Sequence, residues 1–476
     1  MTLYEHFRTI DSPIPADRQG AKRHYGVHPY FTRRPFNVVR QYIQHYSREG
    51  DRVLDPFGGS GVTAIEAFLS NRIGIQNDIN PLANFIAEGI FDLSKGTITE
   101  YTAALSEVSD RCKQRVLALD DADDSTIERL LERLPLPENV PLPANADVQR
   151  YHELFSPRQL AALAIIREAV DDIPDRYPRS GIRLAWSATL AKINRTFLSA
   201  EGRAESRGGS SIFSIYRYKV AENPVELSPW PTFYERAQNV LTAKEEIDRE
   251  IEYRKRTGGF SGKCEFYDFD IESLPDRIKP VDYIFTDPPY GGHISYLDLS
   301  TLWNAWNGTM PSQKDRSREL IVGGDLNLSE DVYLKRLHDS VRTCFALLGP
   351  KRWLSVVFQH WSTAYFDAIL TAAAEAGSEL RAAISQIGDP VWSMHKKKGK
   401  QSVLAGELIL TFLKTGKPKT IDTNKTFDVE AALARTLKKT RTGMVYGEYL
   451  LNRIVVDAWQ SGALGSQTST AVSSHT

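Results

Sequence analysis

The chain has 476 residues, of which 41% are hydrophobic and 25% are charged, a composition typical of a folded protein with roughly two to four domains. Its 59 Lys and Arg residues balance 60 Asp and Glu residues, which argues against a histone-like basic coat but leaves room for local basic patches that bind nucleic acid. No segment has the apolar core of a signal peptide or the roughly 18 apolar residues of a membrane span. The three cysteines are scattered, as in proteins of reducing compartments. We therefore expect a cytoplasmic protein that does not associate with membranes.

The first part of the chain has the pattern of a nucleotide-binding fold. Helices alternate with short buried strands, and this alternation predicts a parallel sheet covered by helices. The predicted elements are an amphipathic helix over residues 36–46, a strand over 52–54, a glycine turn, a helix over 62–69 and a strand over 73–75.

A long middle stretch has a different pattern. Apolar residues recur at intervals of three and four, as in Leu160, Leu163 and Ile166, which predicts helices. Strand patterns then return over residues 264–267, 283–285, 353–358 and 408–412. The organisation we predict has five parts: a first part of the catalytic domain (1–95), a mainly helical insertion that is a candidate for target recognition (96–256), a second part of the catalytic domain (257–416), a small C-terminal helical region (417–460) and a disordered tail (461–476).

One motif follows the first predicted strand, Asp55-Pro56-Phe57-Gly58-Gly59-Ser60-Gly61. Glycines let the backbone approach a ligand, and the following helix N-terminus is electropositive. Asp78, at the end of the next strand, is placed to accept hydrogen bonds from ribose hydroxyls. The glycine spacing of NAD sites and the Gly-Lys-Ser/Thr of phosphate loops are both absent, which favours another nucleoside cofactor. On its own, such a turn also fits an ordinary tight connection in another sheet protein.

A second motif, Asp287-Pro288-Pro289-Tyr290, follows the hydrophobic strand 283–285. The amino group of a base is a poor nucleophile because its lone pair is delocalised into the ring. The Asp287 carboxylate and the Pro288 carbonyl, acting as two acceptors, would draw it toward tetrahedral geometry, and the Tyr290 ring offers a face for stacking. The alternative is a structural turn in which Asp287 only caps the backbone.

At these residues the sequence resembles the S-adenosylmethionine-dependent DNA methyltransferases that methylate adenine N6 or cytosine N4. Asp55 to Gly61 resembles the cofactor motif of this family, and Asp287 to Tyr290 its catalytic motif. Weaker similarities lie at His28-Pro29-Tyr30 with Arg34-Pro35, at Asn77 to Ala83, and at Asp270 to Pro275.

The resemblance implies a doubly wound, mostly parallel α/β sheet of the Rossmann-like class I methyltransferase type, with the helical insertion and the C-terminal helices added to it. It implies S-adenosylmethionine as cofactor, double-stranded DNA as partner, base flipping, and no metal. A restriction or defence-system partner is compatible with it, and the oligomeric state stays open. The implied catalytic residues are Asp287, Pro288, Pro289 and Tyr290, and the implied cofactor-binding residues are His28, Tyr30, Asp55, Pro56, Phe57, Gly58, Gly59, Gly61, Asp78 and Asp270.

The sequence leaves the target base and the class of function open. An aspartate at the first position of the catalytic motif is commoner in the adenine enzymes of this family, so adenine N6 is the expected target and cytosine N4 the alternative. Methylation of RNA at a base amino group is a second class of function. A catalytically silent subunit with the same fold is a third, although the intact motifs argue against it.

Overall fold

The structure, a computed structural model, describes residues 3–17, 23–198, 209–221, 224–292, 294–360, 362–386 and 407–418, with the isolated residues 428, 431, 456–458 and 461. The predicted C-terminal helices (417–460) and tail (461–476) fall almost entirely outside the described residues. Of the Gly/Ser/Arg-rich segment 201–211 within the insertion, residues 201–208 also lie outside the described residues.

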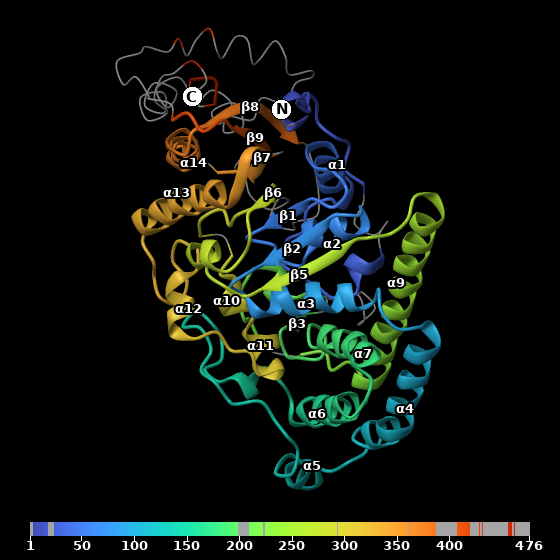
Figure 1. Ribbon diagram of the computed structural model, residues 1–476. Helices are drawn as coiled ribbons and strands as arrows, with labels where there is room; N and C mark the ends of the chain where they lie inside the picture. The colour runs from blue at the N-terminus through green and yellow to red at the C-terminus, as the bar shows by residue number, and fades with distance from the viewer. Residues whose placement is uncertain are drawn as a thin grey trace.

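A seven-stranded sheet forms the centre of the described structure (Figure 1), in the order β5-β2-β1-β6-β7-β9-β8. Neighbouring strands are parallel, except that β9 runs antiparallel to both β7 and β8. The strands are β1 (Arg52–Asp55), β2 (Ile73–Asn77), β5 (Lys263–Tyr267), β6 (Val281–Thr286), β7 (Leu348–Phe358), β8 (Ser378–Gln386) and β9 (Glu407–Lys414). The predicted strands are all present, and β8 is an additional one.

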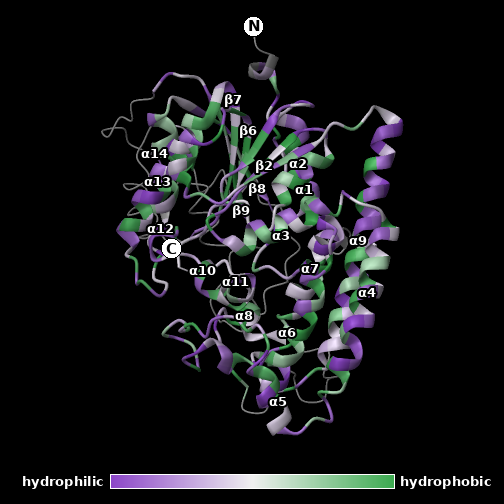
Figure 2. Cartoon of the chain, turned by 60° about the horizontal axis from the view of Figure 1, so that its bottom comes forward, coloured by the Kyte–Doolittle hydropathy of each residue, from purple (hydrophilic) through white to green (hydrophobic). Residues whose placement is uncertain are grey.

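Helices cover both faces of the sheet because side chains alternate along each strand. Val53 and Tyr283 point into one apolar core, which α1 (Phe36–Tyr46), α2 (Val62–Leu69) and α3 (Pro81–Asp92) complete. Leu54 and Ile284 point into the other core, which α13 (Glu330–Leu347) and α14 (Thr363–Glu375) complete. In Figure 2 the strands are mainly hydrophobic, whereas much of α9 is hydrophilic. The doubly wound, mostly parallel fold predicted from the sequence is confirmed.

The chain reverses its direction of winding between β1 and β6. From β1 it proceeds outward to β2 and β5, and from β6 it proceeds outward on the other side to β7. The loops that follow β1 and β6 therefore diverge, and such a switch point opens a crevice at the carboxyl ends of the strands. Asp55 is the last residue of β1, and Asp287 directly follows β6.

The residues between β2 and β5 are mainly helical. Below the sheet in the view of Figure 1, α7 (Arg176–Thr189) packs against α3, and α9 (Pro229–Thr257) stands to the right of the sheet. The longest helix, α9, has 29 residues and packs along α7 and α4. A short ribbon, β3 (Phe197–Leu198) with β4 (Gly209–Ser210), interrupts the helices. The helices after α3 are α4 (Ile98–Leu117), α5 (Asp124–Leu131), α6 (Pro157–Asp171), α7 (Arg176–Thr189), α8 (Ser211–Ser214) and α9 (Pro229–Thr257).

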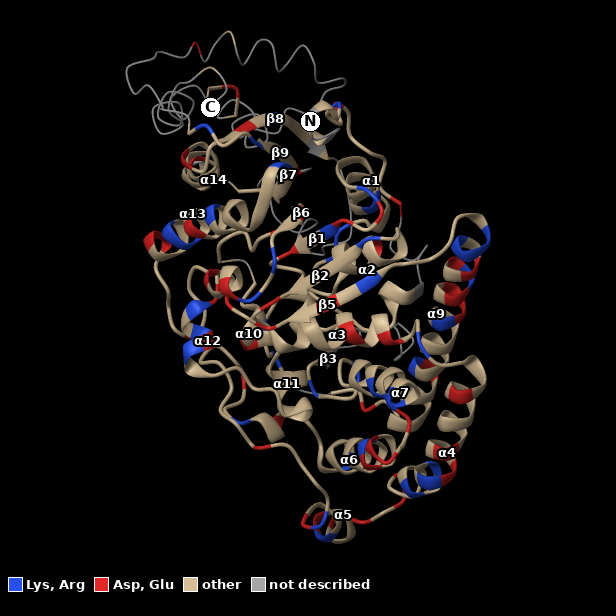
Figure 3. Cartoon of the chain, in the orientation of Figure 1, with Lys and Arg blue, Asp and Glu red and all other residues tan. Residues whose placement is uncertain are grey.

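Short helical elements complete the described chain. Three of them, α10, α11 and α12, follow the catalytic motif, and α12 contains Lys and Arg residues, coloured blue in Figure 3. The bounds are η1 (Leu3–His6), η3 (Arg23–Gly26), η4 (Tyr151–Leu154), η6 (Ile271–Asp276), α10 (Tyr296–Leu299), α11 (Thr301–Asn307) and α12 (Gln313–Arg318).

Candidate active site

The glycine turn between β1 and α2 is packed too closely for side chains. A Cβ atom on Gly58 would lie 2.1 Å from Oε1 of the buried Gln76. Gly59 and Gly61 have φ angles of 51° and 88°, a region that residues with a Cβ atom rarely adopt. Gly61 then caps the N-terminus of α2. At its glycine positions the turn thus presents backbone to the crevice.

The carboxylate of Asp55 fixes this turn to the neighbouring strand. It accepts hydrogen bonds from Thr286 Oγ1 and Thr63 Oγ1, both at 2.8 Å, and from the Phe57 N–H at 3.1 Å. Burial raises its pKa to about 7, although these three donors oppose the shift. Because Thr286 precedes Asp287, the bond to Asp55 links the two sequence motifs directly.

Asp78 lies beside the turn as predicted. Its Oδ2 accepts the Gly59 N–H and its Oδ1 accepts the Asn80 N–H, both at 2.8 Å. Burial raises the pKa of Asp78 to about 6. A carboxylate has about four lone-pair positions, so acceptor capacity remains on each oxygen for hydroxyl groups of a ligand.

The covering segment, residues 28–35, lies over the glycine turn. Cε1 of Tyr30 would be 3.2 Å from a Cβ on Gly59. His28 is fully buried, with Nδ1 2.7 Å from the Pro29 carbonyl and Nε2 3.0 Å from Ser187 Oγ. Burial lowers the pKa of His28 to about 3. His28 therefore does not line the crevice, in contrast to Tyr30, and instead attaches this segment to the insertion.

A cavity of about 250 Å³ runs along the crevice from the covering segment to Asp270. Most of the predicted cofactor-binding residues line it: Tyr30, Asp55, Pro56, Phe57, Gly58, Gly59, Asp78 and Asp270. The other two predicted cofactor-binding residues, His28 and Gly61, do not line this cavity.

Several residues without a predicted role also line this cavity. Arg33 donates to Ser60 Oγ at 2.8 Å and to the His28 carbonyl at 2.5 Å, and burial lowers its pKa to about 10. Glu319 accepts the Leu297 N–H at 3.0 Å, and burial raises its pKa to about 8. At the far end, Arg318 forms an ion pair with Asp270. No sequence motif marks these contacts, whose partners lie between 5 and 48 positions apart in the chain.

The catalytic motif borders a second, smaller cavity, lined by Thr32, Arg34, Asp287, Pro288, Pro289, Tyr290, Gly291, Ile294 and Tyr296. The Tyr290 ring packs edge-on against Phe358 with ring centroids 5.0 Å apart. Tyr290 also donates its hydroxyl hydrogen to Asp287 Oδ1. The two cavities share Thr32, Arg34, Asp287, Pro289 and Tyr296. Asp287 therefore lies where the cavities meet.

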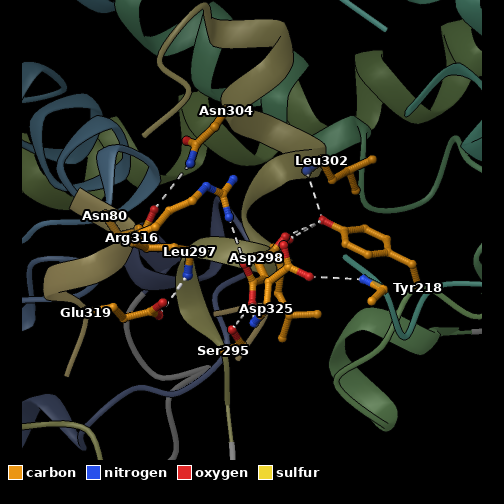
Figure 4. Close-up of polar contacts among 12 residues, drawn as sticks. Asn80, Tyr218, Ser295, Leu297, Asp298, Leu302, Asn304, Arg316, Glu319 and Asp325 are labelled. Atoms are coloured by element: carbon orange, nitrogen blue, oxygen red, sulfur yellow. Dashed lines mark hydrogen bonds and ion pairs between the residues drawn. The ribbon is translucent and has the colours of Figure 1, made fainter. Parts of the chain in front are cut away.

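A network of buried and partly buried polar contacts supports the segment that follows the catalytic motif (Figure 4). Asp298 accepts hydrogen bonds from Arg316 Nη1 at 2.7 Å and from the Asp325 N–H at 3.0 Å. The Tyr218 hydroxyl, from the insertion, donates to the Leu299 carbonyl at 2.7 Å. The insertion and the catalytic segment are thus joined through hydrogen bonds that a shift of either would break.

Trp303 and Asn304, which follow this segment, belong to the core. Trp303 Nε1 donates to the Ser187 carbonyl at 3.1 Å, and Asn304 is fully buried with its amide 3.5 Å from Asn80 Oδ1. Asn304 lines neither of the two cavities.

The comparisons with known proteins agree with this site. The family model described as DNA methylase matches residues 11–87, which include the covering segment, the glycine turn and Asp78. The type II methyltransferase M.MjaII of Methanocaldococcus jannaschii is 29% identical over 119 residues, 25% of this chain and 22% of the relative. The probable type III restriction-modification enzyme HindVI Mod subunit of Haemophilus influenzae is 34% identical over 124 residues, 23% of this chain and 17% of the relative. The chain thus spans about a fifth of the length of these relatives.

Two solved structures were also matched. They are TrmN from Thermus thermophilus (15% identity, 38% of this chain and 40% of that one, TM-score 0.18) and the rRNA methyltransferase aviRa from Streptomyces viridochromogenes (11% identity, 82% of this chain and 87% of that one, TM-score 0.28). These scores are too low to support an inference about this chain.

The sheet order and the crevice define a protein with the Rossmann-like fold of class I methyltransferases. Within that class, the match of residues 11–87 to the DNA methylase model and the two relatives support the predicted amino-methylating family. This similarity implies S-adenosylmethionine as the methyl donor.

The residues of the larger cavity fit this cofactor. Asp78 has acceptor capacity for ribose hydroxyls, the cavity wall around Phe57 and Phe269 is aromatic, and the glycine turn leaves space that a Cβ would fill. In the part of the chain that the structure describes, no group of His, Cys, Asp or Glu side chains is arranged to hold a metal ion. No described helix is long and apolar enough to cross a membrane.

Proposed function

We propose that the chain is a DNA methyltransferase that transfers a methyl group from S-adenosylmethionine to the N6 amino group of adenine in double-stranded DNA. One observation carries the proposal: Asp287 lies at the junction of the cofactor cavity and a second cavity bordered by the catalytic motif. A reacting amino group and a methyl donor must meet at such a junction.

The residues at the junction suit activation of an amino group. S-adenosylmethionine, when bound, supplies an electrophilic methyl group. The Asp287 carboxylate and the Pro288 carbonyl accept the two amino hydrogens, which localises the lone pair on nitrogen for in-line attack. The methyl group would come from S-adenosylmethionine held in the larger cavity, the electron pair of its S–C bond would remain on sulfur, and the extra proton of the amino nitrogen would leave to water. The main contributions of the protein are positioning and polarisation.

The target base must leave the duplex to enter the smaller cavity. A paired base cannot reach a recessed turn, so the base is flipped out of the stack. The Tyr290 ring, fixed by Phe358, provides the stacking surface. Adenine is favoured over cytosine because Asp, rather than Ser, occupies the first position of the catalytic motif.

The proposed association with a restriction or defence system rests on the two relatives. The two relatives are described as a type II methyltransferase and a type III Mod subunit, and we propose that this chain likewise acts within a restriction or defence system. The helical insertion (96–256) is the proposed target-recognition region, because hydrogen bonds of Tyr218 attach it to the segment after the catalytic motif.

The test is methyl transfer from labelled S-adenosylmethionine to unmethylated genomic DNA, and in parallel to total RNA, followed by digestion and separation of nucleosides. Label in N6-methyladenine that disappears in Asp287→Ala supports the proposal. The matched control is Asp331→Ala, an exposed residue in the first turn of α13, which should retain full activity. Label in N4-methylcytosine would make cytosine, not adenine, the target base. Label in RNA alone would refute DNA as the substrate, and no label in either nucleic acid would indicate a catalytically silent subunit.

A further inference from the structure

Arg34 lies between two carboxylates at the junction of the cavities. Its Nε donates to Asp287 Oδ2 at 2.5 Å, and its Nη1 forms an ion pair with Glu407 Oε2. Its Nη2 donates to the Tyr290 hydroxyl at 3.0 Å. The side chains of Arg34, Asp287 and Glu407 are 17%, 19% and 25% exposed, so water screens these charges only in part.

The arrangement follows from the fold. Pro35 precedes α1 and ends the covering segment, so Arg34 projects where that segment meets the catalytic motif. Glu407 is the first residue of β9, which pairs with β7 next to β6. Three segments that are distant in sequence therefore bring one cation and two anions together.

The net charge of Arg34, Asp287 and Glu407 affects how well Asp287 can stabilise the reacting amino group. Positive charge develops on the amino nitrogen as it attacks the methyl group, and the Asp287 carboxylate stabilises that charge. A guanidinium paired with Asp287 alone would neutralise the carboxylate and repel the developing cation. With Glu407 as a second partner, the three groups carry a net charge of −1, so a negative charge remains for the amino group.

We propose that Arg34 and Glu407 are positioning residues for Asp287, an inference that rests on the proposed function. Arg34 donates hydrogen bonds to Asp287 Oδ2 and to the Tyr290 hydroxyl, and these bonds fix the orientation of the Asp287 carboxylate. Glu407 neutralises Arg34, which preserves the strength of Asp287 as an acceptor. The lone pairs of Asp287 that neither Arg34 nor Tyr290 uses are those available to the base.

The test is a double-mutant cycle on methyl transfer, with kcat and the KM values for cofactor and DNA measured separately. Glu407→Gln removes the second carboxylate from Arg34, and kcat should fall about tenfold, the size of one strong charge coupling, with the KM for cofactor unchanged. Arg34→Met/Glu407→Gln removes both charges and should recover most of that loss, so that the double variant is faster than Glu407→Gln.

Two further variants control the cycle. Arg34→Lys keeps the charge but reaches fewer acceptors, and it should be slower than wild type and faster than Arg34→Met. Glu379→Gln, on the neighbouring strand β8 and paired with Arg381, should leave kcat unchanged. Binding of S-adenosylmethionine by each variant, measured by calorimetry, establishes that the cofactor half is folded.

The outcomes separate the two levels of the argument. If the wild type transfers no methyl group to nucleic acid, the proposed function fails and this inference fails with it. If the wild type is active but Glu407→Gln lies within twofold of it, or if the two substitutions are simply additive, only the inference is overturned. A kcat above wild type for Arg34→Met would also overturn it, because Arg34 would then be an obstacle that the substrate displaces.

Discussion

Asp78 allows a quantitative test of the cofactor site. In the wild type, the Gly59 and Asn80 N–H groups each donate to Asp78 at 2.8 Å. Asp78→Ala removes both acceptors, and each buried N–H group left without a partner costs about 1–3 kcal/mol. The cofactor loses in addition a charged acceptor for its ribose hydroxyls, worth about 1.5–3 kcal/mol. We therefore expect the dissociation constant for S-adenosylmethionine to rise by roughly 10- to 100-fold or more.

The measurement is isothermal titration calorimetry with S-adenosylmethionine and with its demethylated product, alongside thermal unfolding. Asp78→Asn keeps one acceptor oxygen but turns an N–H donor toward the turn, and should bind with intermediate affinity. Because the pKa of Asp78 is raised to about 6, affinity should also fall as the pH drops through about 6, and this dependence should be weaker in Asp78→Asn. Binding by Asp78→Ala within twofold of wild type would refute the assignment of this carboxylate to the cofactor.

Three other predictions follow from the site. Gly58→Ala places a Cβ 2.1 Å from Gln76 Oε1, and overpacking of this kind costs about 1–3 kcal/mol; cofactor titration should show weakened binding, and unchanged binding would contradict the close packing of the turn. Tyr290→Ala removes the stacking surface, worth about 1–3 kcal/mol per base, so kcat/KM for DNA should fall roughly 10- to 100-fold while cofactor binding is retained; equal losses in both would indicate a structural role. The folded-state pKa of Glu319 is about 8 against an ordinary 4.5, so the folded protein binds the extra proton between these values; its contribution to stability is complete below about pH 4.5 and lost as the pH rises through about 8. Denaturant unfolding should show this decline and Glu319→Gln should flatten it, whereas an equal slope in both proteins would reject the assignment.

The sequence predicted those parts of the structure that depend on local pattern. Buried strands such as 52–54 and 283–285 are marked by continuous apolar residues, and the turns that follow them are marked by glycine and proline. Because ligands bind at the carboxyl ends of parallel strands, the positions of Asp55 and Asp287 followed from their places in the chain. The strand β8 was not predicted, since its residues 378–386 include polar and charged side chains.

The contacts of the site that were not predicted are non-local. Arg34 and Glu407 are separated by 373 positions, and no residue pattern near either one indicates the other. The same applies to Arg318 and Asp270, which lie 48 positions apart. For His28, the sequence predicted a contact with the cofactor that the structure does not show. His28 belongs to a segment that resembles the family, but its ring faces the insertion, where it pairs with Ser187. Pairing of this kind is determined by tertiary packing and not by local sequence.

The most direct test of the account is the identity of the methylated nucleoside in DNA from a host that lacks DNA methylation of its own and expresses this chain. Total DNA is digested to nucleosides and analysed by mass spectrometry, with Asp287→Ala and the exposed control Asp331→Ala expressed to equal levels. We predict N6-methyladenine in DNA from cells with the wild type and Asp331→Ala, and none with Asp287→Ala. Unmodified DNA in all three, or modification that persists in Asp287→Ala, would contradict the central claim that the Asp287 junction is where a base amino group is methylated.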